Sequence, residues 1–272
     1  MNSPLRSENP LALVRRQDEA GVATLTLQSP ASRNALSLAM IEALIGEFAA
    51  IGADPSVRVV VLAGDGPALS AGHDLKELRA HRNDADRGEA FYQRVMTRCA
   101  DLMRQIVDLP KPVIAAVEGI ATAAGCQLVA TCDLAISGDK ARFALPGVGI
   151  GLFCSTPLVA VGRAVSRKHA MEMALTGALY LAHEAERFGL VNRVVPAGEA
   201  LAEAQKLAAA IAARSAATVA IGKRAFYQQM EMPLAEAYAL AARAMVENLA
   251  HADAGEGIGA FLDKRTPHWE GA

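Results

Sequence analysis

The chain has 272 residues and a formal net charge of −2, from 27 basic and 29 acidic side chains. This balance gives no electrostatic basis for binding nucleic acid or an anionic membrane surface, so we expect neither as a partner. The four cysteines form no Cys-x-x-Cys pair, and no His/Cys ligand spacing occurs in the sequence. We therefore predict no disulfide framework and no metal site.

The first ten residues contain no apolar signal core, and the chain has no run of 18 apolar residues. These patterns predict no membrane span and a cytoplasmic location. Arg6, Arg15 and Arg16 stand among few early acids, so an organelle transit segment remains the alternative to a short disordered leader.

The first two thirds of the sequence predict alternating strands and helices. Residues 11–15 and 22–27 read as a strand hairpin, and Ser37 caps a periodic helix that continues to Ile51. Further strands are expected at 58–63, 112–117 and 133–137, and further helices at 91–109 and 123–131. Strands that alternate with helices in this way predict a layered α/β core.

The last third is helical in pattern and rich in alanine. Helices are expected at 171–175, 182–188, 201–213, 218–228, 234–251 and 256–262. We therefore divide the chain into a core, residues 1–195, which carries the candidate site, and a C-terminal helical region, residues 196–272.

Two strand-to-helix junctions carry small residues that would let a ligand approach the backbone. The first is Leu69–Leu75 (LSAGHDL), and the second is Gly119–Gln127 (GIATAAGCQ). A helix N-terminus offers unpaired N–H groups and a partial positive charge, which suit an oxygen that gains negative charge. The alternative is that both are ordinary turns whose small residues only allow tight packing.

These segments resemble those of the enoyl-CoA hydratase/isomerase (crotonase) family. The segment SAGHDLKEL (70–78) is similar to the family's first oxyanion segment, and GIATAAGCQLVATCD (119–133) is similar to the second. Later blocks at 143–152, 176–177, 185–196 and 261–265 resemble the family's in order and spacing. The resemblance extends from about residue 10 to about residue 269.

The resemblance implies a spiral of strand-strand-helix (ββα, ClpP-like) units with a C-terminal helical region that forms homotrimers or dimers of trimers. It implies an acyl-CoA thioester as ligand, with no cofactor beyond coenzyme A as part of the substrate. The N–H groups of Ala71 and Ala124 would bind the thioester oxygen. The expected contacts to CoA are Arg33, Ala35, Ala71, Gly72, His73 and Asp74, together with Phe261 and Lys264 of a neighbouring subunit.

The sequence departs from the family where its hydratases carry catalytic glutamates. Gln127 and Gly147 occupy those two positions, and Ser155 stands where the family's dienoyl isomerases use a further acid. An amide cannot accept a proton at neutral pH, so the usual acid/base pair is missing. The resemblance nominally implies an enoyl-CoA hydratase/isomerase, a lyase of fatty acid metabolism. The alternatives are another acyl-CoA reaction (decarboxylase or thioesterase) and acyl-CoA binding without catalysis.

Other side chains offer weaker candidates for chemistry. Histidine ordinarily titrates near neutral pH, so His73 is a candidate catalytic residue, unless it points away while Asp74 only caps a helix. Cys126 is a possible nucleophile or a packed small side chain. Glu118 is either a displaced base or a solvent-facing turn residue. The Cys154–Pro157 segment lines an acyl pocket or caps the following helix.

Overall fold

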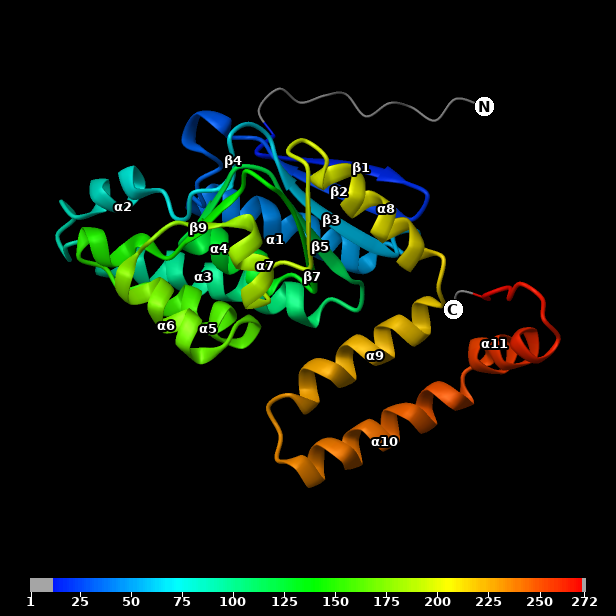
Figure 1. Cartoon of the computed structure of the whole chain (residues 1–272). Coiled ribbons are helices and arrows are strands. Elements are labelled where there is room, and N and C mark those ends of the chain that lie inside the picture. The colour runs from blue at the N-terminus through cyan, green and yellow to red at the C-terminus, as the bar shows by residue number, and fades with distance from the viewer. Residues whose placement is uncertain (1–11, 271–272) are drawn as a thin grey trace.

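The structure, a computed structural model, describes residues 12–270 and contains two sheets (Figure 1). The larger sheet has the order β1-β2-β3-β5-β7-β10, with β1 antiparallel to β2 and all other neighbours parallel. Its strands are β1 Val14–Glu19, β2 Val22–Leu27, β3 Val59–Gly64, β5 Val113–Val117, β7 Leu134–Gly138 and β10 Arg193–Val195. The smaller sheet contains β4 Ala68–Ser70, β6 Ile120–Thr122, β8 Arg142–Ala144 and β9 Tyr180–Leu181 in that order.

Helices surround the sheets and fill the C-terminal third. The body contains α1 Leu38–Ala53, α2 Leu75–His81, α3 Glu89–Asp108, α4 Ala124–Thr131, α5 Ser155–Ala164, α6 Arg167–Thr176, α7 Ala182–Phe188 and α8 Ala200–Ala212. The C-terminal helices are α9 Ala216–Gln229, α10 Leu234–Ala250 and α11 Ala252–Leu262. Two short 3-10 turns, η1 Pro30–Ser32 and η2 Pro146–Ile150, complete the elements.

The central strands are buried on both faces, as parallel strands usually are. Alternate residues of β3 face opposite layers, since side chains alternate along a strand. Val60 and Leu62 join the core that α1 and α3 cover, whereas Val59 and Val61 pack with Ala204 of α8. The sheet therefore lies between two helical layers, which confirms the predicted α/β architecture.

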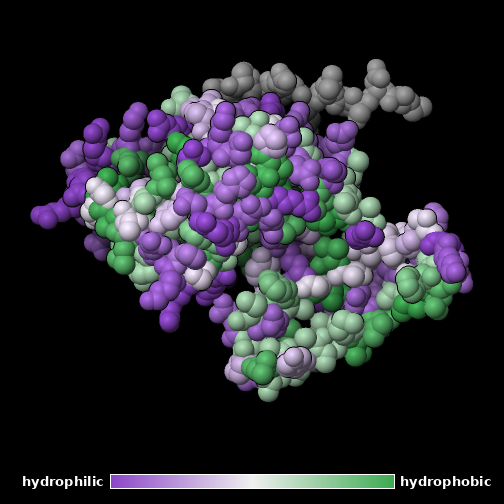
Figure 2. All heavy atoms as spheres, in the orientation of Figure 1, coloured by the Kyte–Doolittle hydropathy of each residue, from purple (hydrophilic) through white to green (hydrophobic). Residues whose placement is uncertain are grey.

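Helices α9, α10 and α11 extend away from the body as an arm (Figure 1). Apolar residues gather on this arm in Figure 2, and Leu234, Tyr238, Val246, Phe261 and Leu262 are all more than two-thirds exposed. Helix α8, which follows residue 195, packs on the sheet and so lies with the body. The division of the chain at residue 195 stays a prediction. Within residues 12–270, no helix is long and apolar enough to cross a membrane.

The predicted long elements are present, with bounds that match or shift by up to four residues; residue 11 of the first predicted strand lies outside the described residues. Ser37 caps α1 as expected, with its Oγ accepting a hydrogen bond from the Met40 N–H at 3.2 Å. The smaller sheet was not predicted, because its strands have only two or three residues each. A pattern of period two needs a longer run to stand out from a loop.

Candidate active site

Strands β4 and β6 bring the two small-residue junctions together. They pair in parallel, with Ser70 opposite Ala121. Parallel neighbours end at the same edge of a sheet, so the chain enters α2 and α4 from adjacent positions. The sequence predicted these two segments separately, and the structure places them side by side.

The two junctions approach each other closely at Gly72, whose φ is +93°. A Cβ atom at this position would lie 2.8 Å from the Ala123 Cβ, 3.0 Å from the Thr122 carbonyl oxygen and 3.2 Å from the Ala124 nitrogen. Only glycine therefore fits both the backbone conformation and the space.

A third segment, the loop between η1 and α1, lies along the first junction. The Ala71 N–H donates to the Arg33 carbonyl at 3.0 Å, and the Leu36 N–H donates to the Gly72 carbonyl at 2.7 Å. These bonds place Arg33 and Ala35 beside residues 71–74, so the residues expected to contact CoA on this side form one cluster. They also correct the prediction for Ala71, because its N–H is already paired and is not free for a ligand.

Other backbone N–H groups at this place are free. No acceptor is recorded for the His73 N–H or the Ala124 N–H anywhere in residues 12–270. Ala124 is the first residue of α4, where an N–H has no partner within the helix. The preceding Ala123 has φ 51° and ψ −120°, a conformation that favours glycine and directs the chain into α4. The free N–H groups here thus include those of His73 and Ala124, but not that of Ala71.

The His73 side chain turns toward the third segment. Its Nδ1 lies 3.3 Å from the Leu36 carbonyl oxygen, which only accepts hydrogen bonds, so Nδ1 carries the proton. Burial lowers the pKa of His73, and the bond to Leu36 opposes that shift only in part. The ring is therefore neutral at pH 7. Its Nε2 is an acceptor, buried and without a partner among the described residues.

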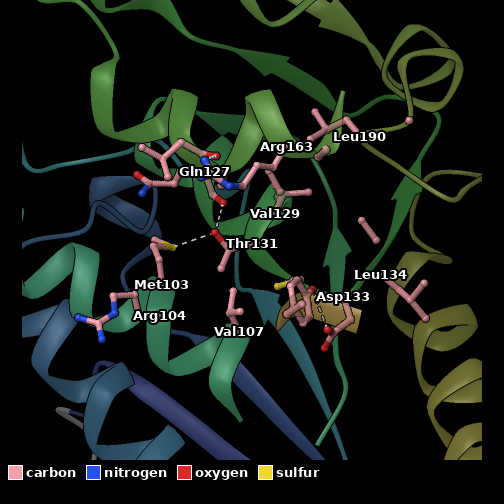
Figure 3. A pocket seen from close by; sticks show the side chains of 18 of the residues that line it. Met103, Arg104, Val107, Gln127, Val129, Thr131, Asp133, Leu134, Arg163 and Leu190 are labelled. Atoms are coloured by element: carbon pink, nitrogen blue, oxygen red, sulfur yellow. Dashed lines mark hydrogen bonds between the residues drawn. The ribbon is translucent and has the colours of Figure 1, made fainter. Parts of the chain in front are cut away.

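Gln127 lies three residues after Ala124, on the same face of α4. The residue is 4% exposed, and its Oε1 is buried without a hydrogen-bond partner among residues 12–270. Gln127 also lines a cavity of about 480 Å³ between α3, α4, α5 and α9. Figure 3 shows it at one side of this cavity, with Met103 and Thr131 along the same wall.

Gly147, the other position without a carboxylate, lies buried in η2. A Cβ atom there would lie 2.7 Å from the Leu152 carbonyl oxygen and 2.9 Å from the Cys154 Sγ. The space that a longer side chain would enter is thus filled by the segment leading into α5. Ser155, the third neutral position, is exposed at the start of α5.

The remaining polar candidates have structural roles. Asp74 caps α2, with its Oδ1 accepting from the Lys76 and Glu77 N–H groups at 2.8 and 3.2 Å. Glu118 binds the start of α8 through the Gly198 and Ala200 N–H groups at 3.0 and 2.9 Å, so it is not a displaced base. Glu118 is not a solvent-facing turn residue either, because both of these hydrogen bonds hold its carboxylate.

Burial raises the pKa of the Cys126 thiol to about 12, so at neutral pH it is not a nucleophilic thiolate.

In the part of the chain that the structure describes, no group of three or more His, Cys, Asp or Glu side chains could hold a metal ion. Helix α11, which contains Phe261 and ends two residues before Lys264, lies far from β4 in the same copy (Figure 1). Their predicted contact with CoA bound to a neighbouring subunit stays a prediction.

Comparisons with curated proteins give a consistent set of relatives. The chain is 48% identical over 253 residues to enoyl-CoA hydratase domain-containing protein 3, mitochondrial, of Xenopus laevis, covering 93% of this chain and 84% of that protein. It is 34% identical over 260 residues to the 2,3-dehydroadipyl-CoA hydratase of Escherichia coli, covering 95% and 98%. Five vertebrate relatives, at 43–48% identity, are all named mitochondrial. These names contradict the predicted cytoplasmic location. The basic leader at Arg6 lies outside the described residues.

Solved structures and a family model agree with those relatives. An enoyl-CoA hydratase from Mycobacterium smegmatis superposes with a TM-score of 0.89 at 49% identity, covering 94% of this chain and 98% of that one. The human enoyl-CoA hydratase domain-containing protein 3 gives 0.90 at 44% identity, covering 94% and 100%. The model named "Enoyl-CoA hydratase/isomerase" matches residues 17–272. The chain therefore belongs to the enoyl-CoA hydratase/isomerase family and has its crotonase fold.

Proposed function

We propose that this chain binds an acyl-CoA thioester with the carbonyl oxygen between the N–H groups of His73 and Ala124. The observation that carries this proposal is the close approach of Gly72, the residue before His73, to the Ala124 nitrogen, with no acceptor for the His73 or Ala124 N–H among residues 12–270. Donors fixed in a buried place stabilise an oxygen that gains negative charge, and the start of α4 adds the positive end of a helix dipole. The name of the E. coli relative, a hydratase of an enoyl-CoA, supports a thioester ligand.

The reaction at this site is not the standard hydration. Hydration needs a base that activates water and an acid that protonates the neighbouring carbon. Gln127 cannot accept a proton, and Gly147 has no side chain. Loss of such a pair lowers the rate by about 10²–10⁴ for each lost member. Decarboxylation or thioester hydrolysis would depend mainly on the two N–H groups, and binding without turnover would need only those donors.

The apolar arm supports the assembly expected from the family, a homotrimer or a dimer of trimers. Side chains as exposed as Tyr238 and Val246 on a separate helical arm are typical of a surface that another subunit covers. In such an assembly, Phe261 and Lys264 would reach the CoA of a neighbour.

A matched pair of ligands tests the thioester site directly. Butyryl-CoA and S-butyl-CoA differ only in the thioester carbonyl, so titration calorimetry on the full chain compares binding with and without the oxygen. We expect butyryl-CoA to bind at least about tenfold more tightly, since two hydrogen bonds are at stake. Equal affinities would rule out a role for the two N–H groups.

Steady-state turnover of crotonyl-CoA tests the missing acid/base pair. We expect little or no hydration by the wild type and a gain in the Gln127→Glu variant. The Gln127→Glu/Gly147→Glu double variant completes the pair, but a side chain at 147 must first displace Leu152 and Cys154. Robust wild-type hydration would contradict the proposal and point to a base not yet identified.

A further inference from the structure

The chain returns from the end of α11 to the junction between α8 and α9 (Figure 1). At this junction the Trp269 Nε1 donates a hydrogen bond to the Ala213 carbonyl at 2.9 Å. The next residue, Glu270, donates its N–H at 2.9 Å to Oδ1 of Asp253, a buried carboxylate in the first turn of α11. Residues 265–270, which we call the strap, therefore connect the end of α11 both to its own start and to the α8–α9 junction.

A second carboxylate of α11 holds the other half of the strap. Arg265 donates to both oxygens of Glu256, at 2.6 and 2.8 Å, and the His268 N–H donates to Glu256 Oε1 at 2.8 Å. The hydrogen bonds from Arg265 are the main cause that lowers the pKa of Glu256 to about 2. Glu256 is therefore ionised at neutral pH, and all three hydrogen bonds are made to a charged group.

The strap covers one face of α11. Positions three, four and seven residues apart lie on the same side of a helix. On α11 this side carries Asp253, Glu256, Gly257 and Ala260. A Cβ atom on Gly257 would lie 3.3 Å from the Trp269 ring, so glycine at this position lets the ring approach the helix backbone. The large apolar side chains of α11 lie on another side, where Ile258, Phe261 and Leu262 are more than half exposed.

Helix α11 has few other contacts that would hold it, whereas α9 has several. Lys223 ties α9 to the body through buried hydrogen bonds, and the ion pair of Arg163 with Glu231, at 2.8 Å, ties the turn after α9 to α5. Within α11 only Asp253 and Ala260 are buried. Elements with little buried apolar surface and exposed hydrogen bonds open locally at a lower free energy than the rest of a protein.

We propose that the strap is a conformational switch of the arm: when closed it holds α11 at the α8–α9 junction, and when open it releases α11 while α9 and α10 keep their positions. The Ser215 hydroxyl donates to Asp253 Oδ2 at 2.5 Å, so the first turn of α11 stays attached and acts as the pivot. Release changes the position of the exposed apolar side chains of α11. It concerns the arm and does not depend on the thioester site.

Two glutamate variants of the full chain form a matched pair for the test. Glu256→Ala removes all three hydrogen bonds that this carboxylate accepts from the strap. Glu247→Ala is the control, because Glu247 of α10 accepts from Arg224 at the same distances, 2.6 and 2.8 Å, but lies outside the strap. Trp269 is the only tryptophan of the chain, so quenching of its fluorescence by acrylamide reports on the strap directly.

Hydrogen exchange of the three arm helices separates release of α11 from opening of the whole arm. In Glu256→Ala we expect the α11 amides to exchange at least about tenfold faster, because hydrogen bonds to a charged group are lost. The amides of α9 and α10 should keep their protection, and Trp269 should become more accessible to acrylamide. In Glu247→Ala both α11 and Trp269 should behave as in the wild type.

A third variant tests the strap from its other anchor. Trp269→Phe keeps an aromatic ring and removes the donor to Ala213, so α11 should again exchange faster, by about fivefold. Equal exchange of α11 in Glu256→Ala and Glu247→Ala would show that the strap does not hold the helix, and the proposal would be wrong. A joint increase in α9, α10 and α11 would overturn it as well, because the arm would then open as one unit.

Discussion

Gly72 and Ala124 lie in such close contact that a Cβ atom on the first would be 3.2 Å from the nitrogen of the second. They belong to different strand-to-helix junctions, more than fifty residues apart in sequence. The contact exists because β4 and β6 are parallel neighbours and because glycine at 72 adopts a positive φ. The unpaired N–H groups of His73 and Ala124 therefore belong to two segments in direct contact.

A methyl group at position 72 should disrupt this point. In Gly72→Ala the new atom meets Ala123 at 2.8 Å, and the φ of +93° is strained for any L side chain. We expect a loss of stability of about 1–3 kcal/mol and the loss of most of the preference for butyryl-CoA over S-butyl-CoA. Urea denaturation and calorimetry measure the two effects. Gly46→Ala, at an exposed helical position with open space, is the control and should gain about 0.5–1 kcal/mol. If Gly72→Ala kept the full preference for butyryl-CoA over S-butyl-CoA, the contact between Gly72 and Ala124 would not be needed for thioester binding.

Ala123 holds a conformation that costs free energy. Its φ of 51° and ψ of −120° favour glycine, and residues held in such regions cost of order 1–3 kcal/mol. Ala123→Gly relieves this strain at a smaller entropic cost in the unfolded chain, so we expect a net gain of about 1 kcal/mol in urea denaturation. Ala130→Gly, within α4, should instead lose about 1 kcal/mol. If both variants were destabilised alike, position 123 would not be strained.

The sequence predicted the long elements and the two junctions well, because long buried strands and capped helices have clear local signals. It could not predict which N–H groups are free. That depends on the pairing of Ala71 with Arg33, a contact between segments distant in sequence. The unpaired Oε1 of Gln127 likewise depends on everything packed around it. The role of Glu118 at the start of α8 had no local signal either, since it joins positions 80 residues apart.

The lowered pKa of His73 predicts a pH-dependent loss of stability. The unfolded chain takes up a proton near the ordinary histidine value of about 6.5, while the buried ring in the folded chain stays neutral to lower pH. The unfolded state then binds more protons, so stability decreases as pH falls through 6.5 and stops decreasing below the folded pKa. Urea midpoints between pH 7.5 and 5 should fall more for the wild type than for His73→Asn. Equal falls in the two proteins would mean that another group is responsible.

The arm predicts a self-association that depends on its apolar face. Val246 lies on α10 and is 67% exposed in the single chain. A charge buried at a subunit contact is costly, so Val246→Glu should convert a trimer or hexamer into smaller species. Sedimentation equilibrium of both proteins measures this change. Arg243→Glu, on the same helix, is a control for added charge. A monomeric wild type would contradict the assembly.

Lys223 of α9 connects the arm to the body through a buried hydrogen-bond network. Its Nζ donates to Asp133 Oδ2 at 2.8 Å and to the carbonyls of Ile106 and Lys111 at 3.0 Å, and its side chain is 6% exposed. Tyr227 from the same helix donates to the other carboxylate oxygen at 2.9 Å. Asp133 lies two residues after the end of α4, so α9 is tied to the helix whose N-terminus carries the Ala124 N–H.

Replacing Lys223 leaves the buried Asp133 carboxylate with one hydrogen-bond partner fewer. We therefore expect Lys223→Met to lose about 3–5 kcal/mol in urea denaturation, the usual cost of breaking a buried ion pair from one side. The neighbouring Arg224 pairs with Glu247 in solvent, so Arg224→Met should change stability by less than about 1 kcal/mol. Hydrogen exchange adds a local measure: the amides of α9 should lose protection in Lys223→Met and keep it in Arg224→Met. Similar small losses in both variants would show that the arm is held by its apolar contacts, with the ion pair contributing little.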